Sequence, residues 1–199
     1  MMRFKDEKRN KKLYTNLFRK FKYSYQSLDW GSKKNQLLRF KILAEIGNLR
    51  GKKILDVGCG FGDFLFWLKK KNIKIDYTGI DLVEGLLEIA KKKSKKNKFI
   101  YGNILNKRIF ENNKFDYVFA SGIFTHYSPK NSEKTMFQIL KRMWDLSSEG
   151  IAFNFLGNNA KKKFPFEFSI DPKSVVKNCC KLSKKMILKK NYLQNDFNI

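Results

Sequence analysis

Three glycines separated by single residues follow a short apolar run at residues 53–57. The stretch reads Asp56-Val57-Gly58-Cys59-Gly60-Phe61-Gly62. Glycine has no Cβ, so a backbone built this way can pass close to a ligand. If a helix follows, its first N–H groups also face that ligand and favour polar or anionic groups. The stretch therefore predicts a site at which an anionic or polar ligand meets the backbone at close range.

Two common glycine-rich sites do not match this spacing. The dinucleotide fingerprint G-x-G-x-x-G/A, counted from Gly58, would place its third small residue at Asp63, which is charged. A P-loop requires Gly-Lys-Ser/Thr, and this tripeptide is absent from the sequence. Pyrophosphate and nucleoside triphosphate are therefore poor candidates for the ligand.

The elements around the glycines alternate between strand and helix patterns. Such alternation is typical of βαβ units with a parallel sheet covered on both faces. We therefore expect an α/β fold with a doubly wound, mainly parallel seven-stranded sheet in a three-layer sandwich, whose last strand is short or truncated. The predicted strands are residues 53–57, 74–81, 98–101, 115–120, 150–156 and 185–192 and one that starts at Phe197, and the predicted helices lie in residues 32–47, 64–68, 86–90, 136–144 and 172–180.

The stretch Ile54–Gly62 resembles motif I of the class I, Rossmann-like S-adenosylmethionine-dependent methyltransferases at every expected position. The resemblance is good over residues 53–156 and loose over residues 25–46. It implies S-adenosyl-L-methionine as cofactor. Asp56 would orient the cationic amino acid end of that cofactor, and Gly58, Cys59, Gly60 and Gly62 would pass beneath it. Cys59 would serve through its backbone and small size.

A second carboxylate, Asp81, ends the next predicted strand. The resemblance implies that Asp81 binds both ribose hydroxyls and that Leu82 packs on the adenine. Taken alone, Asp81 would be an ordinary strand-end residue. The assignment depends on both carboxylates standing at the carboxyl ends of successive predicted strands, where open α/β sheets bind ligands.

Two further segments complete the implied cofactor site. Asn103 and Ile104 stand where the family usually has Asp followed by an apolar residue. Asn103 is a mild departure, because its carboxamide can still accept a hydrogen bond from the adenine amino group. Ser121 and Gly122 follow the fourth predicted strand and are small enough to leave room for the methionine portion.

Methyl transfer to a hydroxyl usually needs a base. His126, the only histidine, follows the fourth predicted strand near the expected acceptor. Imidazole suits proton abstraction near neutral pH, although a surface-loop histidine is the plain alternative. Tyr127 and Tyr25 are the other candidates.

Residues 1–31 form a basic arm and a lid-like aromatic segment in this interpretation, and residues 32–199 form the S-adenosylmethionine-binding domain. The first 23 residues are rich in Lys, Arg and Asn and predict a frayed basic helix or arm. Trp30 would pack on the acceptor or the cofactor; the alternative is that the aromatic side chains of this segment belong partly to the core. Arg39 would reach the cofactor carboxylate, by analogy with similar methyltransferases; a solvated helix face is the alternative.

The composition bounds the class of protein and its partners. Of 199 residues, 42% are hydrophobic, and the net charge is +25. The charge fits RNA binding, but lysine greatly outnumbers arginine and Asn, Ile and Phe are frequent, as in proteins from AT-rich genomes. No apolar run approaches the ~20 residues of a membrane span. Three cysteines without metal-ligand spacing indicate a reducing cytoplasm and no metal.

Three functions remain open from the sequence. A small-molecule methyltransferase acting on oxygen or nitrogen is favoured by the single domain and the lid-like segment. An RNA or ribosomal RNA methyltransferase is favoured by the charge, but the Asn/Asp-Pro-Pro-Phe/Tyr motif of base methylation is absent after the fourth strand, where Ala120–Ile123 stand instead. A non-catalytic cofactor-binding scaffold is the third. Methylation of protein has no residue pattern to support it.

Overall fold

The central sheet is mainly parallel, as the alternating strand and helix pattern predicts. The computed structural model describes residues 3–126, 132–157, 168–193 and 196–199. Within them, six strands form one sheet in the order β3-β2-β1-β4-β5-β6. The first five are parallel and β6 runs antiparallel to β5. The strands are β1 Lys53–Val57, β2 Asp76–Asp81, β3 Lys98–Tyr101, β4 Phe115–Ala120, β5 Ser147–Leu156 and β6 Asp196–Asn198.

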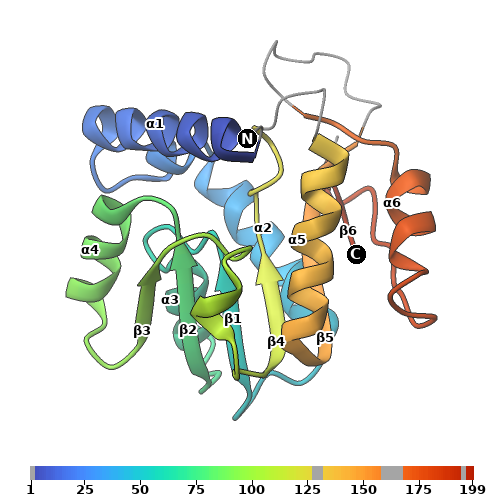
Figure 1. Cartoon of the computed structure of the whole chain (residues 1–199). Helices are drawn as coiled ribbons and strands as arrows, with labels where there is room; N and C mark the ends of the chain where they lie inside the picture. Colours follow the sequence, from blue (N-terminus) through green and yellow to red (C-terminus); the bar gives the residue numbers. More distant parts are fainter. Residues whose placement is uncertain (1–2, 127–131, 158–167, 194–195) are drawn as a thin grey trace.

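Helices cover both faces of this sheet, as predicted (Figure 1). Apolar side chains of α2, α3 and α4 pack on one face, and those of α5 and α6 pack on the other. Neighbouring β1 residues illustrate the two layers, because Ile54 belongs to the first core and Leu55 to the second. The helices are α1 Arg3–Phe21, α2 Lys33–Leu43, α3 Asp63–Lys70, α4 Glu84–Lys93, α5 Ser132–Leu146 and α6 Pro172–Cys179, with short 3₁₀ turns η1 Tyr25–Leu28, η2 Ala44–Ile46 and η3 Lys107–Phe110.

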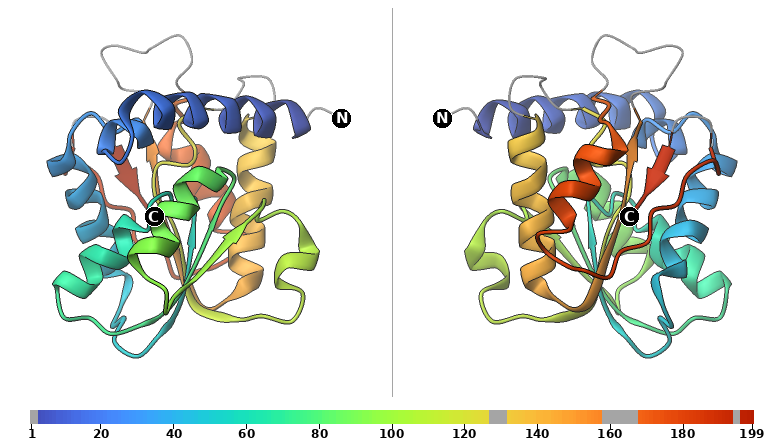
Figure 2. Two further views of the ribbon diagram at one scale, coloured as in Figure 1. Left: turned by 90° about the vertical axis from the view of Figure 1, so that its left-hand side faces the viewer. Right: turned by 90° about the vertical axis from the view of Figure 1, so that its right-hand side faces the viewer.

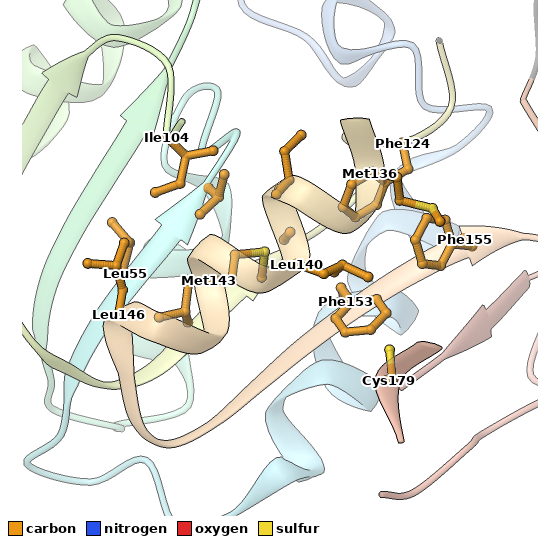
Figure 3. Close-up of a cluster of buried hydrophobic side chains, with 14 of the residues drawn as sticks. Leu55, Ile104, Phe124, Met136, Leu140, Met143, Leu146, Phe153, Phe155 and Cys179 are labelled. Carbon is orange, nitrogen blue, oxygen red and sulfur yellow. The ribbon is translucent and has the colours of Figure 1, made fainter. Parts of the chain in front are cut away.

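The largest core lies between α5 and the middle of the sheet (Figure 3). Met136, Leu140 and Met143 are fully buried at helical spacing on α5. They face Phe153 and other apolar residues of β5, whose alternate side chains point to this side. This core fixes the position of β4 between β1 and β5, and therefore the loop that follows β4.

α1 lies outside the two helix layers, across the edge of the sheet where the parallel strands end (Figures 1 and 2). Tyr14 and Phe18 of α1 pack against a small core that contains Phe61, Val83 and Leu86. The predicted basic arm is thus an ordered helix from Arg3 to Phe21, and its apolar side is partly buried. Its position places it over the glycine turn.

The strand predicted at residues 185–192 is wrong. This segment makes one isolated bridge, in which Lys189 exchanges two backbone hydrogen bonds with Asn198 of β6. Three lysines keep the segment in solvent, Ile187 is 67% exposed, and Asn191 has a left-handed φ of 62° that turns the chain. The predicted strand start at Phe197 is confirmed as β6, so the sheet has six strands in the described residues rather than seven.

Candidate functional site

A cavity of about 140 Å³ opens at the carboxyl ends of β1, β2 and β4 and at the loop after β3. The sheet order reverses direction between β1 and β4, so this is the switch point at which open α/β sheets bind ligands. Most of the predicted cofactor residues line it: Trp30, Asp56, Gly58, Cys59, Asp81, Leu82, Asn103, Ile104, Ser121 and Gly122.

The glycine turn needs its glycines. Gly58, Gly60 and Gly62 have φ of 73°, 53° and 72°, values that side-chain-bearing residues rarely adopt. A Cβ on Gly58 would also lie 2.2 Å from Ile123 Cγ2. Only Gly58 of the three lines the cavity; Gly60 and Gly62 shape the turn behind it.

Asp81 ties the end of β2 to the glycine turn. Its Oδ2 accepts a hydrogen bond from Gly60 N at 2.8 Å, and its Oδ1 accepts one from Val83 N at 2.9 Å. Burial raises the pKa of Asp81 from its ordinary value, and the backbone N–H groups of Gly60 and Val83 oppose that rise. Each oxygen keeps a second lone pair, so the carboxylate is held rigidly while it can still accept from a hydroxyl in the cavity.

Asp56 is a buried acid without a basic partner among the described residues. It is 4% exposed, and the hydroxyl of buried Tyr77 donates to its Oδ2 at 2.6 Å. Burial raises the pKa of Asp56 to about 7; the Tyr77 hydrogen bond lowers it, and the charges of Asp81 and Asp63 raise it further. A cation that enters the cavity would lower the pKa of this carboxyl and favour its ionised form.

Cys59 is a buried wall residue. Burial raises the pKa of its thiol well above the ordinary value, so the sulfur stays protonated. The sulfur lies over Gly79 of β2, where a Cβ would come within 2.6 Å of it. The thiol therefore fills space, as expected from its small size.

Asn103 uses both ends of its carboxamide within the protein. Its Nδ2 donates to Glu7 Oε2 on α1 at 2.7 Å, and its Oδ1 accepts from Leu105 N at 2.9 Å. The residue lines the cavity as predicted, but in this structure its hydrogen bonds hold α1 and the loop after β3.

Arg39 differs from its predicted role. Its guanidinium forms an ion pair with buried Asp196 of β6 and lies 4.8 Å from the centre of the Trp30 ring. Arg39 does not line the cavity, whereas Trp30 does. Trp30 covers Gly122, where a Cβ would meet its Cη2 at 2.6 Å. Arg39 therefore supports the aromatic wall instead of reaching a ligand, because its guanidinium is paired with the buried carboxylate of Asp196 on β6.

His126 lies beside the cavity without lining it. Its Nε2 is 2.6 Å from Oδ2 of Asp29, the residue that follows η1, and its carbonyl oxygen accepts from Arg9 of α1 at 3.0 Å. Tyr14 contacts the imidazole edge-on. His126 thus joins α1, the segment after η1 and the loop after β4. Tyr25 is in η1 and does not line the cavity, and Tyr127 lies outside the described residues.

The sequence interpretation missed the contribution of α1. Glu7, Asn10 and Tyr14 line the cavity from above, at spacings of three and four residues that place them on one face of the helix. The sequence contains that spacing, but the many neighbouring lysines made the segment resemble a solvated basic arm. Gln36 and Asp63 also line the cavity and are joined by a 3.1 Å hydrogen bond.

The donor set fits the cofactor that the glycine turn implies. Two buried polar atoms of cavity-lining residues, Asn10 Oδ1 and Ser121 Oγ, have no hydrogen-bond partner in the described residues. Asp56, whose pKa is raised to about 7, and Asp81, whose carboxylate is held by backbone N–H groups, stand at the ends of the neighbouring strands β1 and β2. This pair suits a ligand with a cationic end and a pair of hydroxyls. No group of three or more His, Cys, Asp or Glu that suits a metal ion occurs in the described ranges.

Comparisons with known proteins agree with this geometry. Residues 54–144 match the model of a family described as a methyltransferase domain. A demethylmenaquinone methyltransferase of Staphylococcus aureus is 34% identical over 119 residues, which are 57% of this chain and 49% of that protein. The chain thus spans about half the length of the curated relatives it matches.

Solved structures share the fold. Magnesium protoporphyrin IX methyltransferase from Synechocystis PCC 6803, crystallised with S-adenosylhomocysteine (SAH), superposes with a TM-score of 0.69 at 14% identity and covers 97% of each chain. An S-adenosylmethionine-dependent methyltransferase from Clostridium acetobutylicum superposes with a TM-score of 0.61 at 16% identity, over 91% of this chain and 96% of that one.

The sheet order and the cavity define an α/β protein of the Rossmann-like class, with a ligand site at its switch point. Within that class, residues 54–144 form a methyltransferase domain by their family match, and this segment holds the glycine turn and both strand-end acids. The glycine turn and these acids resemble those of the class I S-adenosylmethionine-dependent methyltransferases.

Proposed function

We propose that this protein binds S-adenosyl-L-methionine in the cavity and transfers its methyl group to an oxygen or nitrogen atom of a small-molecule acceptor. The observation that carries the proposal is the convergence of Asp56, the glycine turn and Asp81 on one cavity at the switch point. The match of residues 54–144 to a methyltransferase domain covers all three.

A small acceptor is supported by the cover over the site. α1 lies across it, and Trp30 closes one side. Helix α1 and the segment through residue 31 act as a lid in this proposal, because they add lining residues to a cavity that the sheet and its loops begin. The relatives named for demethylmenaquinone and for magnesium protoporphyrin IX carry small-molecule acceptors in their names.

Several residues would hold the cofactor. Asp81 would accept from the ribose hydroxyls, and ionised Asp56 would face the cationic amino acid end. Leu82 and Ile104 would enclose the adenine. Asn103 would border it, and Ser121 and Gly122 would leave space for the methionine portion.

When bound, the cofactor would supply an electrophilic sulfonium methyl group for in-line displacement by the acceptor atom. The protein's part is chiefly placement of that acceptor atom, which alone accounts for a large share of the rate. Trp30, braced by Arg39, forms a rigid apolar wall beside Gly122. Such a wall excludes water from the reacting atoms.

His126 would take the proton that an O–H or N–H acceptor loses. Its contact with Asp29 fixes the ring and would stabilise the imidazolium that forms. Tyr25 and Tyr127 remain the other candidates for this role.

The test is transfer of labelled methyl from S-adenosylmethionine into an extract separated into RNA, protein and small-molecule fractions, with Asp81→Ala as the inactive control. Label in the small-molecule fraction that depends on Asp81 would support the proposal. Label in RNA would show that the net charge of +25 serves substrate binding and would overturn the small-molecule acceptor. Absence of label in every fraction would favour a non-catalytic scaffold.

A further inference from the structure

The N-terminal helix α1 holds a polar side chain over the cavity whose carboxamide oxygen has no hydrogen-bond partner among the described residues. Asn10 is 8% exposed and lines the cavity, yet its Oδ1 has no hydrogen-bond donor in the described residues. Burying a carbonyl oxygen without a hydrogen-bond donor costs free energy, so such atoms are rare unless a bound molecule supplies the donor.

Asn10 cannot simply turn away, because α1 is fixed on both sides of it. One turn earlier, Glu7 accepts a hydrogen bond from Asn103 at 2.7 Å. One turn later, Tyr14 packs against the small core of Phe61, Val83 and Leu86 and contacts the ring of His126. Side chains three and four residues apart share one helix face, so these two contacts set the direction of Asn10 as well.

The same contacts tell which part of the ligand Asn10 faces. Glu7 and Asn103 mark the loop after β3, and Val83 and Leu86 follow Asp81 on β2. In the proposed binding mode these two segments enclose the adenine and the ribose. Asn10 stands between the contacts that α1 makes with them, on the nucleoside side of the cavity.

From this placement we propose that Asn10 is a further cofactor-binding residue, whose Oδ1 accepts a hydrogen bond from the nucleoside half of S-adenosylmethionine. The inference rests on the proposed function, since it deepens the cofactor site. It gives α1 a direct share in ligand binding, in addition to its role as a cover. An amino or hydroxyl group of adenosine supplies the donor that the protein lacks.

The test compares two ligands that share the nucleoside. SAH carries the amino acid half, and 5′-methylthioadenosine lacks it. Asn10→Ala and the nearly isosteric Asn10→Leu should each weaken binding of both ligands about tenfold, the range expected for one lost hydrogen bond to a buried acceptor. Lys12→Ala, an exposed position on the same helix, should leave both affinities unchanged.

The stability of the ligand-free protein gives the second readout. Removing an unpartnered buried oxygen should leave the melting temperature of Asn10→Leu unchanged or higher, while ligand affinity falls. A residue that merely packs α1 would lower both together, and that result would overturn the inference. Unchanged affinity for both ligands would overturn it too. Weaker SAH binding with unchanged methylthioadenosine binding would place Asn10 at the amino acid half and contradict the assignment.

A wild-type protein that binds neither ligand would instead refute the proposed function, on which the inference depends. Asp81→Ala separates the two failures. If that variant loses binding of both ligands while Asn10→Ala and Asn10→Leu keep it, the cofactor site is correct and the role of Asn10 is wrong.

Discussion

Asp56→Asn replaces the carboxyl group with an amide. In the ligand-free protein, the unfolding free energy of this variant relative to wild type should be higher at pH 8 than at pH 5. The folded protein raises the pKa of this carboxyl from 3.8 to about 7 because the side chain is buried. The folded state therefore binds a proton more tightly than the unfolded state. By linkage, stability falls as pH rises from about 4 to about 7 and is level above that.

The size of the effect follows from the shift. Ionised Asp56 costs the fold about 4 kcal/mol at pH 8 and about 1.5 kcal/mol at pH 5. The amide of Asp56→Asn has no such dependence, and its own burial cost is the same at both values of pH. The difference in unfolding free energy between variant and wild type should thus grow by about 2.5 kcal/mol from pH 5 to pH 8.

Urea unfolding of both proteins at pH 5, 6, 7 and 8 measures this difference directly. Asp76→Asn, an exposed carboxyl at the start of β2, is the matched control and should show no such trend. SAH binding should weaken in Asp56→Asn at pH 8, because the charge that faces the ligand's ammonium group is gone. A stability difference that does not vary with pH would refute the reasoning about burial.

Three further outcomes are expected. Asp81→Ala should weaken SAH binding by about 10- to 100-fold in calorimetry without unfolding the domain, since hydrogen bonds to a charged acceptor are lost; unchanged affinity would remove the ribose assignment. His126→Ala should lower turnover by about 100-fold or more while SAH affinity stays the same, and full activity would eliminate the base. Arg39→Ala should destabilise the protein by about 3 kcal/mol because it leaves buried Asp196 unpaired, with little effect on SAH affinity. The reverse pattern for Arg39, lost affinity with intact stability, would restore its predicted role at the cofactor.

The parts of the site that sequence predicts are those set by local patterns. Residues 53–57 form a strand that is buried from Ile54 on, because its apolar residues are covered on both faces of the sheet, and the glycines after it permit the turn that follows. Asp81 follows by the same logic, one strand further. These features depend on neighbours in the chain, and their relative position depends only on parallel pairing.

The features that sequence did not predict depend on contacts between distant residues. The sequence does not tell whether Arg39 pairs with a ligand or with an acidic side chain of the protein. Only the folded sheet brings Asp196 beside it. Residues 185–192 contain a short apolar run at 186–188, but the segment forms one isolated bridge with β6 in place of a ladder. Likewise, the lysine-rich composition of α1 concealed the face that carries Glu7 and Asn10.

The pairing of Arg39 with Asp196 also bears on the order in which the protein matures during synthesis. All of the glycine turn and the first five strands emerge from the ribosome before residue 196 is made. Contacts between residues this far apart in sequence form late and slowly. In a nascent chain the glycine turn would therefore form before the Arg39–Asp196 ion pair that supports Trp30. The aromatic wall near Gly122 would then be the last part of the pocket to become ordered.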